Sequence, residues 1–325
     1  MKKLNIVIVA GAVAVLAYMV VRTGWSGAVQ QLTAVRNVLP LLMGLSLVRL
    51  ALQTLAWSTA LRAEGIRAGF GELILARSSS RGVGYLSVLG PAVAEPLRIS
   101  MLRDRSSAAA AATLIDTGVY WFSSGLFAIL GTICALHFLG GSSHPLPLIV
   151  MVTGTAVGLF FIARPKPRLP GLVRRLGSRC PKFVTKGIEV EAAMRDFQAR
   201  HPQAIRLILV LDLLCQVLIA AEVVAIFACF GIPFHPVMVL ALEAANRVVK
   251  MAGGLVPARM GTDESGMAAA FVAFGLPSAS GLALALARRT RDLLEALLGI
   301  AWVSWRSRSA KTTSEPVAAT QLASA

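Results

Sequence analysis

The sequence predicts an all-α, polytopic integral membrane protein with about six transmembrane helices and two oppositely oriented re-entrant helical hairpins. Of the 325 residues, 56% are hydrophobic and only 15% are charged, and the mean hydropathy is +0.71. This composition is typical of multi-span membrane proteins and not of soluble domains. The hairpins are predicted by two charged segments that lie inside apolar sequence and share one pattern.

The apolar runs and the loops between them give the order of the spans. From apolar length we expect spans at 4–21, 38–57, 114–138, 148–163, 205–229 and 281–305. The first run is longer than a usual signal core and no small-x-small site follows it, so we expect an uncleaved helix. The connections 140–147 and 231–236 contain no Lys or Arg, which is typical of outside loops.

Residues 164–200 form the clearest cytoplasmic loop, because they hold ten Lys/Arg residues against three acidic ones. Within this loop we expect a surface helix at about 184–198. The alternation of basic and uncharged loops places both termini in the cytoplasm. The sequence therefore predicts a multi-pass protein of a bacterial-type cytoplasmic (inner) membrane.

The second charged segment, 244–271, combines ionisable residues with a helix break inside apolar sequence. Only protein or a water-filled cavity satisfies backbone groups freed by such a break, which predicts a re-entrant hairpin. The first charged segment, 72–101, has the same layout, since Arg81 precedes Pro91 by ten positions, as Arg247 precedes Pro257.

Further matches extend this repeat, because Arg77 and Glu243 each stand four residues before those arginines. Matches in register predict an inverted repeat, with repeat A at about 38–139 and repeat B at about 205–305. We expect both repeats within a single transmembrane domain, 1–309, followed by a disordered tail at about 310–325.

The hairpin signatures carry a family resemblance. A proline-containing turn followed by Glu95-Pro-Leu-Arg98, and Leu255-Val-Pro257 followed by Gly261-Thr-Asp263-Glu264, resemble the paired signatures of the lysylphosphatidylglycerol synthase transmembrane-region family. Members are also called flippase-like membrane proteins, and they often have an acidic residue where Asp116 stands in the third span. In place of the glycine-rich turn of the family, Pro257 is followed by Ala-Arg-Met.

The resemblance also bears on the activity. One branch of the family accompanies hopanoid biosynthesis, and a chain of this length without an appended domain is similar to that branch. In the two-part synthases lysyl transfer resides in a separate soluble domain, so the resemblance implies that this chain is not a lysyltransferase. We therefore expect that the protein is not an enzyme.

The leading functional hypothesis is translocation of a membrane lipid or glycolipid, linked to hopanoid or other envelope lipid biosynthesis. Arginines offer positive charge to a head-group phosphate, and carboxylates balance that charge or carry a proton. The expected substrate-path residues are Arg81, Glu95, Arg98, Asp116, Arg247, Arg259, Asp263, Glu264 and Arg288. The expected helix breaks are Pro91, Gly253, Gly254 and Pro257. Alternatively, these ionisable groups only neutralise one another and hold the hairpins together.

Burial of charge also predicts contacts, because an unpaired ion in the interior costs several kcal/mol. One of the two carboxylates Asp263 and Glu264 is therefore expected within pairing reach of Arg247, Arg259 or Arg288. Glu95 is expected near Arg81 or Arg98. Four ionisable residues of the sixth span lie on one helical stripe, which predicts an inward face and the pairs Arg288–Asp292 and Arg291–Glu295. Arg49 in the second span is likewise expected to face protein.

Two other functions stay open. A non-transporting partner would recruit lipid-biosynthetic enzymes through the loop 164–200, and an intramembrane lipid-modifying enzyme would use Asp263 and Glu264 as a base. Adjacent helical residues diverge by about 100°, which disfavours the enzyme. Scattered Cys and His residues indicate no metal site, and we expect no catalytic residue or cofactor. The net charge of +16 is explained by the cytoplasmic loops, so the expected partner is a lipid and not nucleic acid.

Overall fold

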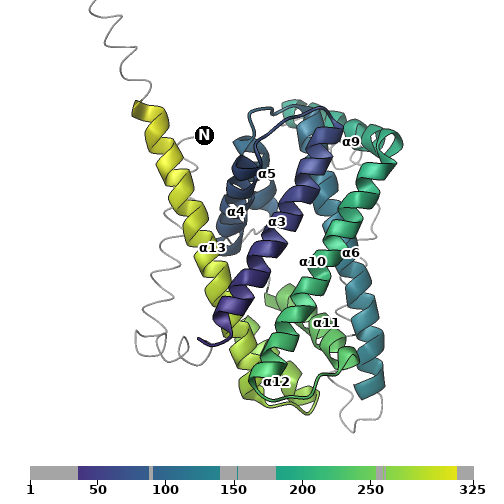
Figure 1. The fold of residues 1–325 in the computed structure, drawn as a ribbon. Coiled ribbons are helices and arrows are strands. Elements are labelled where there is room, and N and C mark those ends of the chain that lie inside the picture. The colour runs from purple at the N-terminus through teal and green to yellow at the C-terminus, as the bar shows by residue number, and fades with distance from the viewer. Residues whose placement is uncertain are drawn as a thin grey trace, which may run out of the picture.

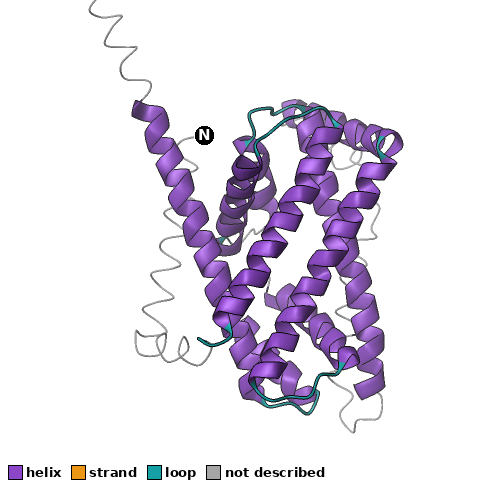
Figure 2. Ribbon diagram, in the orientation of Figure 1, coloured by secondary structure: helices purple, strands orange, loops and turns teal. Residues whose placement is uncertain are grey.

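A computed structural model of the chain describes residues 36–87, 91–139, 152, 181–253, 259 and 261–312. All regular structure in these residues is helical, with loops and turns between the helices (Figure 2). The helices, labelled in Figure 1, are α3 Leu39–Ala63, α4 Phe70–Leu86, α5 Pro91–Met101, α6 Ser107–Leu139, α9 Pro181–Arg200, α10 Pro202–Cys229, α11 Pro236–Ala252, α12 Thr262–Ala273 and α13 Ser278–Thr312. The expected spans at 4–21 and 148–163 lie outside the described residues.

Three of the described helices, α3, α6 and α10, are long and apolar enough to cross a membrane. They correspond to the expected spans at 38–57, 114–138 and 205–229. Large apolar side chains such as Leu47, Ile133 and Val217 are exposed on them, as expected for helices that contact lipid. The prediction of an all-helical membrane protein is confirmed for the described residues, whereas the number and orientation of the spans stay a prediction.

The order long helix, helix pair, long helix occurs twice, as α3–α4–α5–α6 and as α10–α11–α12–α13. Helices α4 and α11 both have 17 residues, and from Phe70 to Pro236 and from Leu86 to Ala252 the shift is 166 residues. The pair α4–α5 lies in the upper part of the bundle in Figure 1, and the pair α11–α12 lies in the lower part. The two pairs therefore occupy opposite ends of the bundle.

The helices of the two halves pack crosswise, because α13 lies along α4 and α6 lies along α11. Both contacts need glycine. A Cβ atom on Gly299 of α13 would lie 2.6 Å from the Cα atom of Ser79, and one on Gly131 of α6 would lie 2.2 Å from the carbonyl oxygen of Leu240. Glycines at these positions let the helix backbones approach closely, as is common in membrane bundles.

Helix α9 corresponds to the surface helix expected at 184–198. The Phe197 side chain is fully buried in an apolar cluster with Trp57 and Leu61 of α3. At the end of α3, the Glu64 carboxylate lies 3.6 Å from both Arg200 Nη2 and His201 Nε2. These contacts hold α9 against the end of the bundle where α3 ends and α10 begins.

The expected helix breaks fall at helix ends where the structure describes them. Pro91 is the first residue of α5, a position where its missing N–H costs no helical hydrogen bond. Gly253 is the C-cap residue of α11. Gly254 and Pro257 lie outside the described residues.

Candidate functional site

The first buried ion cluster joins α4, α5 and α6 through Asp116. Asp116 Oδ2 accepts hydrogen bonds from Arg77 Nη2 and, at 2.5 Å, from Arg98 Nη2. All three side chains are buried. Glu95, one turn before Arg98 in α5, lies 3.7 Å from Arg98 Nη1, which confirms the expected approach of these two residues. We call Arg77, Arg98 and Asp116 the first cluster.

Trp57 of α3 packs against the first cluster. The Arg98 guanidinium carbon lies 3.9 Å from the centroid of the Trp57 ring, a distance suited to a cation–π contact. The indole Nε1 donates a hydrogen bond of 3.0 Å to Thr113 Oγ1 of α6. This bond satisfies the only polar atom of the indole and fixes the ring in place.

The second buried ion cluster joins α10, α11 and α13. Arg288 Nε donates to Glu222 Oε2 at 2.7 Å, and Arg288 Nη2 donates to Glu243 Oε1 at 2.6 Å. Arg291 Nη1 donates to the other oxygen of Glu222. All four side chains are buried, so the inward face expected for α13 is confirmed. We call Glu222, Glu243, Arg288 and Arg291 the second cluster.

The expected pair Arg288–Asp292 is wrong. Arg288 turns toward Glu222 and Glu243 because those carboxylates are buried on facing helices, where an ionised group needs a counter-ion. Asp292 contacts its neighbour Arg291 at 2.9 Å. The expected approach of Arg291 to Glu295 is confirmed, at 4.0 Å.

Arg247 lies at the rim of the second cluster. Its Nη2 atom donates to Gln216 Oε1 at 2.6 Å, and its Nε atom donates to Ser124 Oγ at 3.1 Å. Glu243 Oε2 lies 3.5 Å from Arg247 Nη1, the spacing of an i, i+4 pair within α11. Arg247 therefore joins α11 to α6 and α10.

The two helix pairs approach each other near their connecting turns. The guanidinium carbon of Arg259, between α11 and α12, lies 5.4 Å from the ring centroid of Tyr85 at the end of α4. Asp263 lies 3.4 Å from Arg259, which confirms the expected pairing of a carboxylate in this hairpin. Glu264 pairs with Arg289 of α13, an arginine that was not among the expected partners. Glu264 also accepts a 3.0 Å hydrogen bond from the Gly261 N–H at the start of α12.

Arg81 lies on α4 between the first cluster and Tyr85. It is half-buried, and within the described residues no carboxylate lies within ion-pair distance of it. The buried Arg49 of α3 also has no carboxylate at that distance in the described part of the chain. Along α4 ionisable residues thus run from Glu72 at the start of the helix to Tyr85 at the end.

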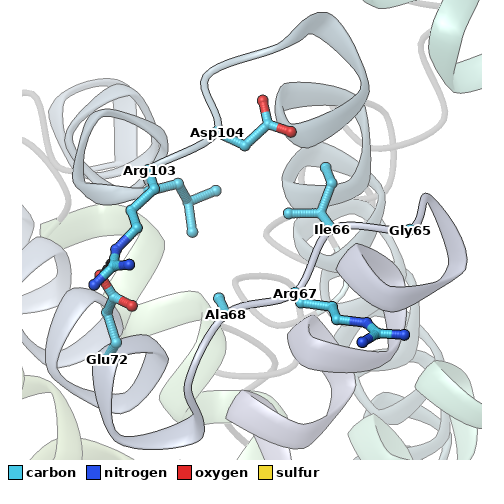
Figure 3. A pocket seen from close by; sticks show the side chains of 8 residues that line it. Gly65, Ile66, Arg67, Ala68, Glu72, Arg103 and Asp104 are labelled. Atoms are coloured by element: carbon cyan, nitrogen blue, oxygen red, sulfur yellow. Dashed lines mark ion pairs between the residues drawn. The ribbon is translucent and has the colours of Figure 1, made fainter.

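A polar pocket of about 240 Å³ lies where α4 begins and α5 ends (Figure 3). It is formed by the turn between α3 and α4 and by the segment after α5. Glu72 and Arg103 face each other across one side of it, at 3.7 Å. The side chain of Arg103 is 88% exposed, so the pocket opens at the end of the bundle where α4 begins.

The chemistry of these groups is electrostatic. Buried guanidinium and carboxylate groups bind anions, cations or protons, and in a membrane protein they mark substrate and ion paths. The described residues contain no group of three or more His, Cys, Asp or Glu side chains placed to hold a metal ion.

A family model for the lysylphosphatidylglycerol synthase TM region matches residues 4–299, which is most of the chain. The chain belongs to this family. Membership indicates a role connected with membrane lipids in a multi-pass membrane protein. No protein of curated function and no solved structure matches the chain. For this member of the lysylphosphatidylglycerol synthase TM-region family, the hopanoid branch stays a prediction.

The structure of this family member brings together expected and unexpected site residues. Arg98, Asp116 and Glu95 meet in or beside the first cluster, and Arg259, Asp263 and Glu264 meet near the hairpin turns. Four central members were not among the expected path residues: Arg77, Glu222, Glu243 and Arg291. The signal that points to them is an ionisable residue inside an apolar span, which is rare unless it faces the interior.

Proposed function

We propose that this protein moves a lipid with a polar head group between the leaflets of the membrane. The observation that carries the proposal is the pair of buried ion clusters, each built on the first helix of one helix pair and on the long helix after that pair. A protein that served only as an inert anchor would not need buried charge, because apolar side chains pack as well or better at such positions.

The arrangement of the helix pairs supports transport by alternating access. Broken helices in inverted repeats, which approach each other from opposite sides of the membrane, are the common architecture of secondary transporters. Here the two pairs lie at opposite ends of the bundle and approach at Tyr85 and Arg259 (Figure 1). In the proposed mechanism a head group passes along the polar side of α4 while its acyl chains stay in lipid.

Arg81 is the side chain best placed to meet such a head group. It is half-buried, follows Arg77 by one turn, and has no carboxylate within ion-pair distance in the described residues. Its charge therefore stays available for a phosphate or another anionic group on the lipid. The pocket at Glu72 and Arg103 is the proposed entrance from the end of the bundle at which α4 begins.

The test is lipid movement in proteoliposomes that carry labelled phospholipids and glycolipids in one leaflet. Arg81→Gln is expected to lower the rate at least tenfold with unchanged thermal stability, because the removed charge neutralises no described carboxylate. Arg195→Gln is the matched control, since this arginine is 77% exposed on α9. Folded wild-type protein that moves none of these lipids contradicts the proposal and favours the non-transporting partner.

A further inference from the structure

Asp212 of α10 differs from the other buried carboxylates of the described helices. Asp116, Glu222 and Glu243 each accept a hydrogen bond from at least one guanidinium group. Asp212 is 1% exposed, and among the described residues its Oδ2 atom has no hydrogen-bond partner. An ionised carboxylate in this setting has lost its hydration and gained no ion pair, which is the costly state of a buried charge.

A residue of α3 at the level of Asp212 also has a buried acceptor without a donor. Cys215 Sγ lies 3.8 Å from the carbonyl oxygen of Arg49, which fixes the register of α10 against α3. The two helices run in opposite directions in Figure 1. One turn from this contact along α3 is Gln53, and one turn from it along α10 is Asp212, so both lie at the same level. Gln53 Oε1 is buried and has no partner among the described residues.

One proton added to Asp212 accounts for the two buried acceptors that lack a donor, Asp212 Oδ2 and Gln53 Oε1. A protonated carboxyl group is a hydrogen-bond donor as well as an acceptor, whereas a carboxylate is an acceptor only. A proton on Asp212 removes its charge and supplies a donor at the level of Gln53.

The groups that face Asp212 connect it to the first cluster. Charged and titratable side chains within electrostatic reach of Asp212 come from α4, α5 and α6 and from α10 itself: Arg77, Arg81, Arg98, Asp116 and Cys215. Asp116 holds Arg77 and Arg98 through direct contacts. Asp212 interacts electrostatically with the same two arginines but makes no ion pair with them.

We propose that Asp212 is a proton-binding site coupled to the first cluster. With the proton bound, Asp212 is neutral and both arginines stay on Asp116. When the proton leaves to water, the new carboxylate competes with Asp116 for Arg77 and Arg98, which draws α4 and α5 away from α6. One proton is exchanged and no covalent bond other than O–H forms or breaks. Proton binding stands independently of lipid movement, while its coupling to transport rests on the proposed function.

Infrared difference spectroscopy of the full chain in lipid vesicles tests proton binding directly. The wild-type protein is expected to show the carbonyl stretch of a carboxylic acid, which disappears as the pH is raised. Asp212→Asn is expected to lose this band, and Asp212→Glu to shift it. Asp196→Asn is the control, because this carboxylate is 58% exposed on α9 and should leave the band unchanged.

Two outcomes overturn proton binding: a spectrum without any band that depends on Asp212, and a band that depends on Asp212 but persists at every pH. The Asp212→Glu shift keeps the test decisive if Asp212→Asn does not fold.

In proteoliposomes, wild-type lipid movement is expected to depend on pH and to lose that dependence in Asp212→Asn. Lipid movement independent of pH, beside a band that titrates, overturns the coupling alone. Absence of all lipid movement overturns the proposed function and leaves the infrared result intact.

Discussion

Arg77 of α4 and Glu243 of α11 lie at matching positions, 166 residues apart, and carry opposite charges. Arg77 contacts Asp116 of α6, and Glu243 contacts Arg288 of α13 at 2.6 Å. In both halves the contact joins the first helix of a pair to the long helix after it, with the signs exchanged. The two halves thus share a geometry while the signs of their charges are exchanged.

Removal of the carboxylate from the first cluster should destabilise the protein strongly. In Asp116→Asn the buried Arg77 guanidinium loses its carboxylate partner and Arg98 keeps only Glu95, at 3.7 Å, so we expect a loss of about 3–5 kcal/mol. Thermal unfolding in detergent measures it. Asp196→Asn, on the exposed side of α9, should change the midpoint little. Equal midpoints for both variants would contradict the role given to Asp116.

Adjacent arginines of α13 should differ in their effect on stability. Arg288 contacts two buried carboxylates and the carbonyl oxygen of Ile219, whereas Arg289 lies at the rim beside Glu264 and is 17% exposed. Arg288→Met should therefore lower the unfolding temperature more than Arg289→Met. The two changes have the same side-chain chemistry, so the reverse order would show that burial of the second cluster does not determine stability.

Substitution of two glycines of α6 by alanine should change stability in different ways, because only one of them lies at a close helix contact. An added methyl group at Gly131 would overlap the carbonyl oxygen of Leu240 in α11, and overpacking of this kind costs about 1–3 kcal/mol. At Gly118 of the same helix, an added Cβ atom would meet nothing within 4 Å, so alanine there should be neutral or stabilise the helix by about 1 kcal/mol or less. Comparison of Gly131→Ala and Gly118→Ala by thermal unfolding checks both values.

The docking of α9 should depend on Phe197. Truncation of this fully buried ring in Phe197→Ala removes its contacts with Trp57 and Leu61, with an expected cost of about 3–5 kcal/mol. Limited proteolysis should then cleave within α9 faster than in the wild-type protein. Gln198→Ala, on the neighbouring exposed position, is the control and should keep the wild-type cleavage rate.

Features of the fold that depend on local sequence pattern could be predicted from the sequence. Apolar length predicted α3, α6 and α10 to within a few residues at one end of each helix, and the matching layout around Arg81 and Arg247 pointed to helix pairs at equivalent places. The partners of the charges were harder to predict. Pairing along one helix gave Arg288 the wrong partner, because sequence spacing does not show which helix faces which.

The central carboxylates illustrate the same limit. Asp212 and Glu222 both stand in one apolar span, and their spacing in the sequence gives them similar surroundings. In the structure Glu222 meets two arginines of α13, whereas Asp212 Oδ2 has no hydrogen-bond partner among the described residues. The helices that face each residue separate the two cases, and that is a property of tertiary packing.

The crosswise packing of α13 on α4 and of α6 on α11 has a consequence for biosynthesis. The ribosome completes α4 more than 200 residues before Gly299, so α4 stays without the helix that covers it until α13 has been made. During that interval its Ser79 face is open to insertion factors and to other nascent chains. The same geometry means that the chain, cut between α9 and α10, should reassemble from two co-expressed fragments, since each fragment supplies the long helix that the other lacks.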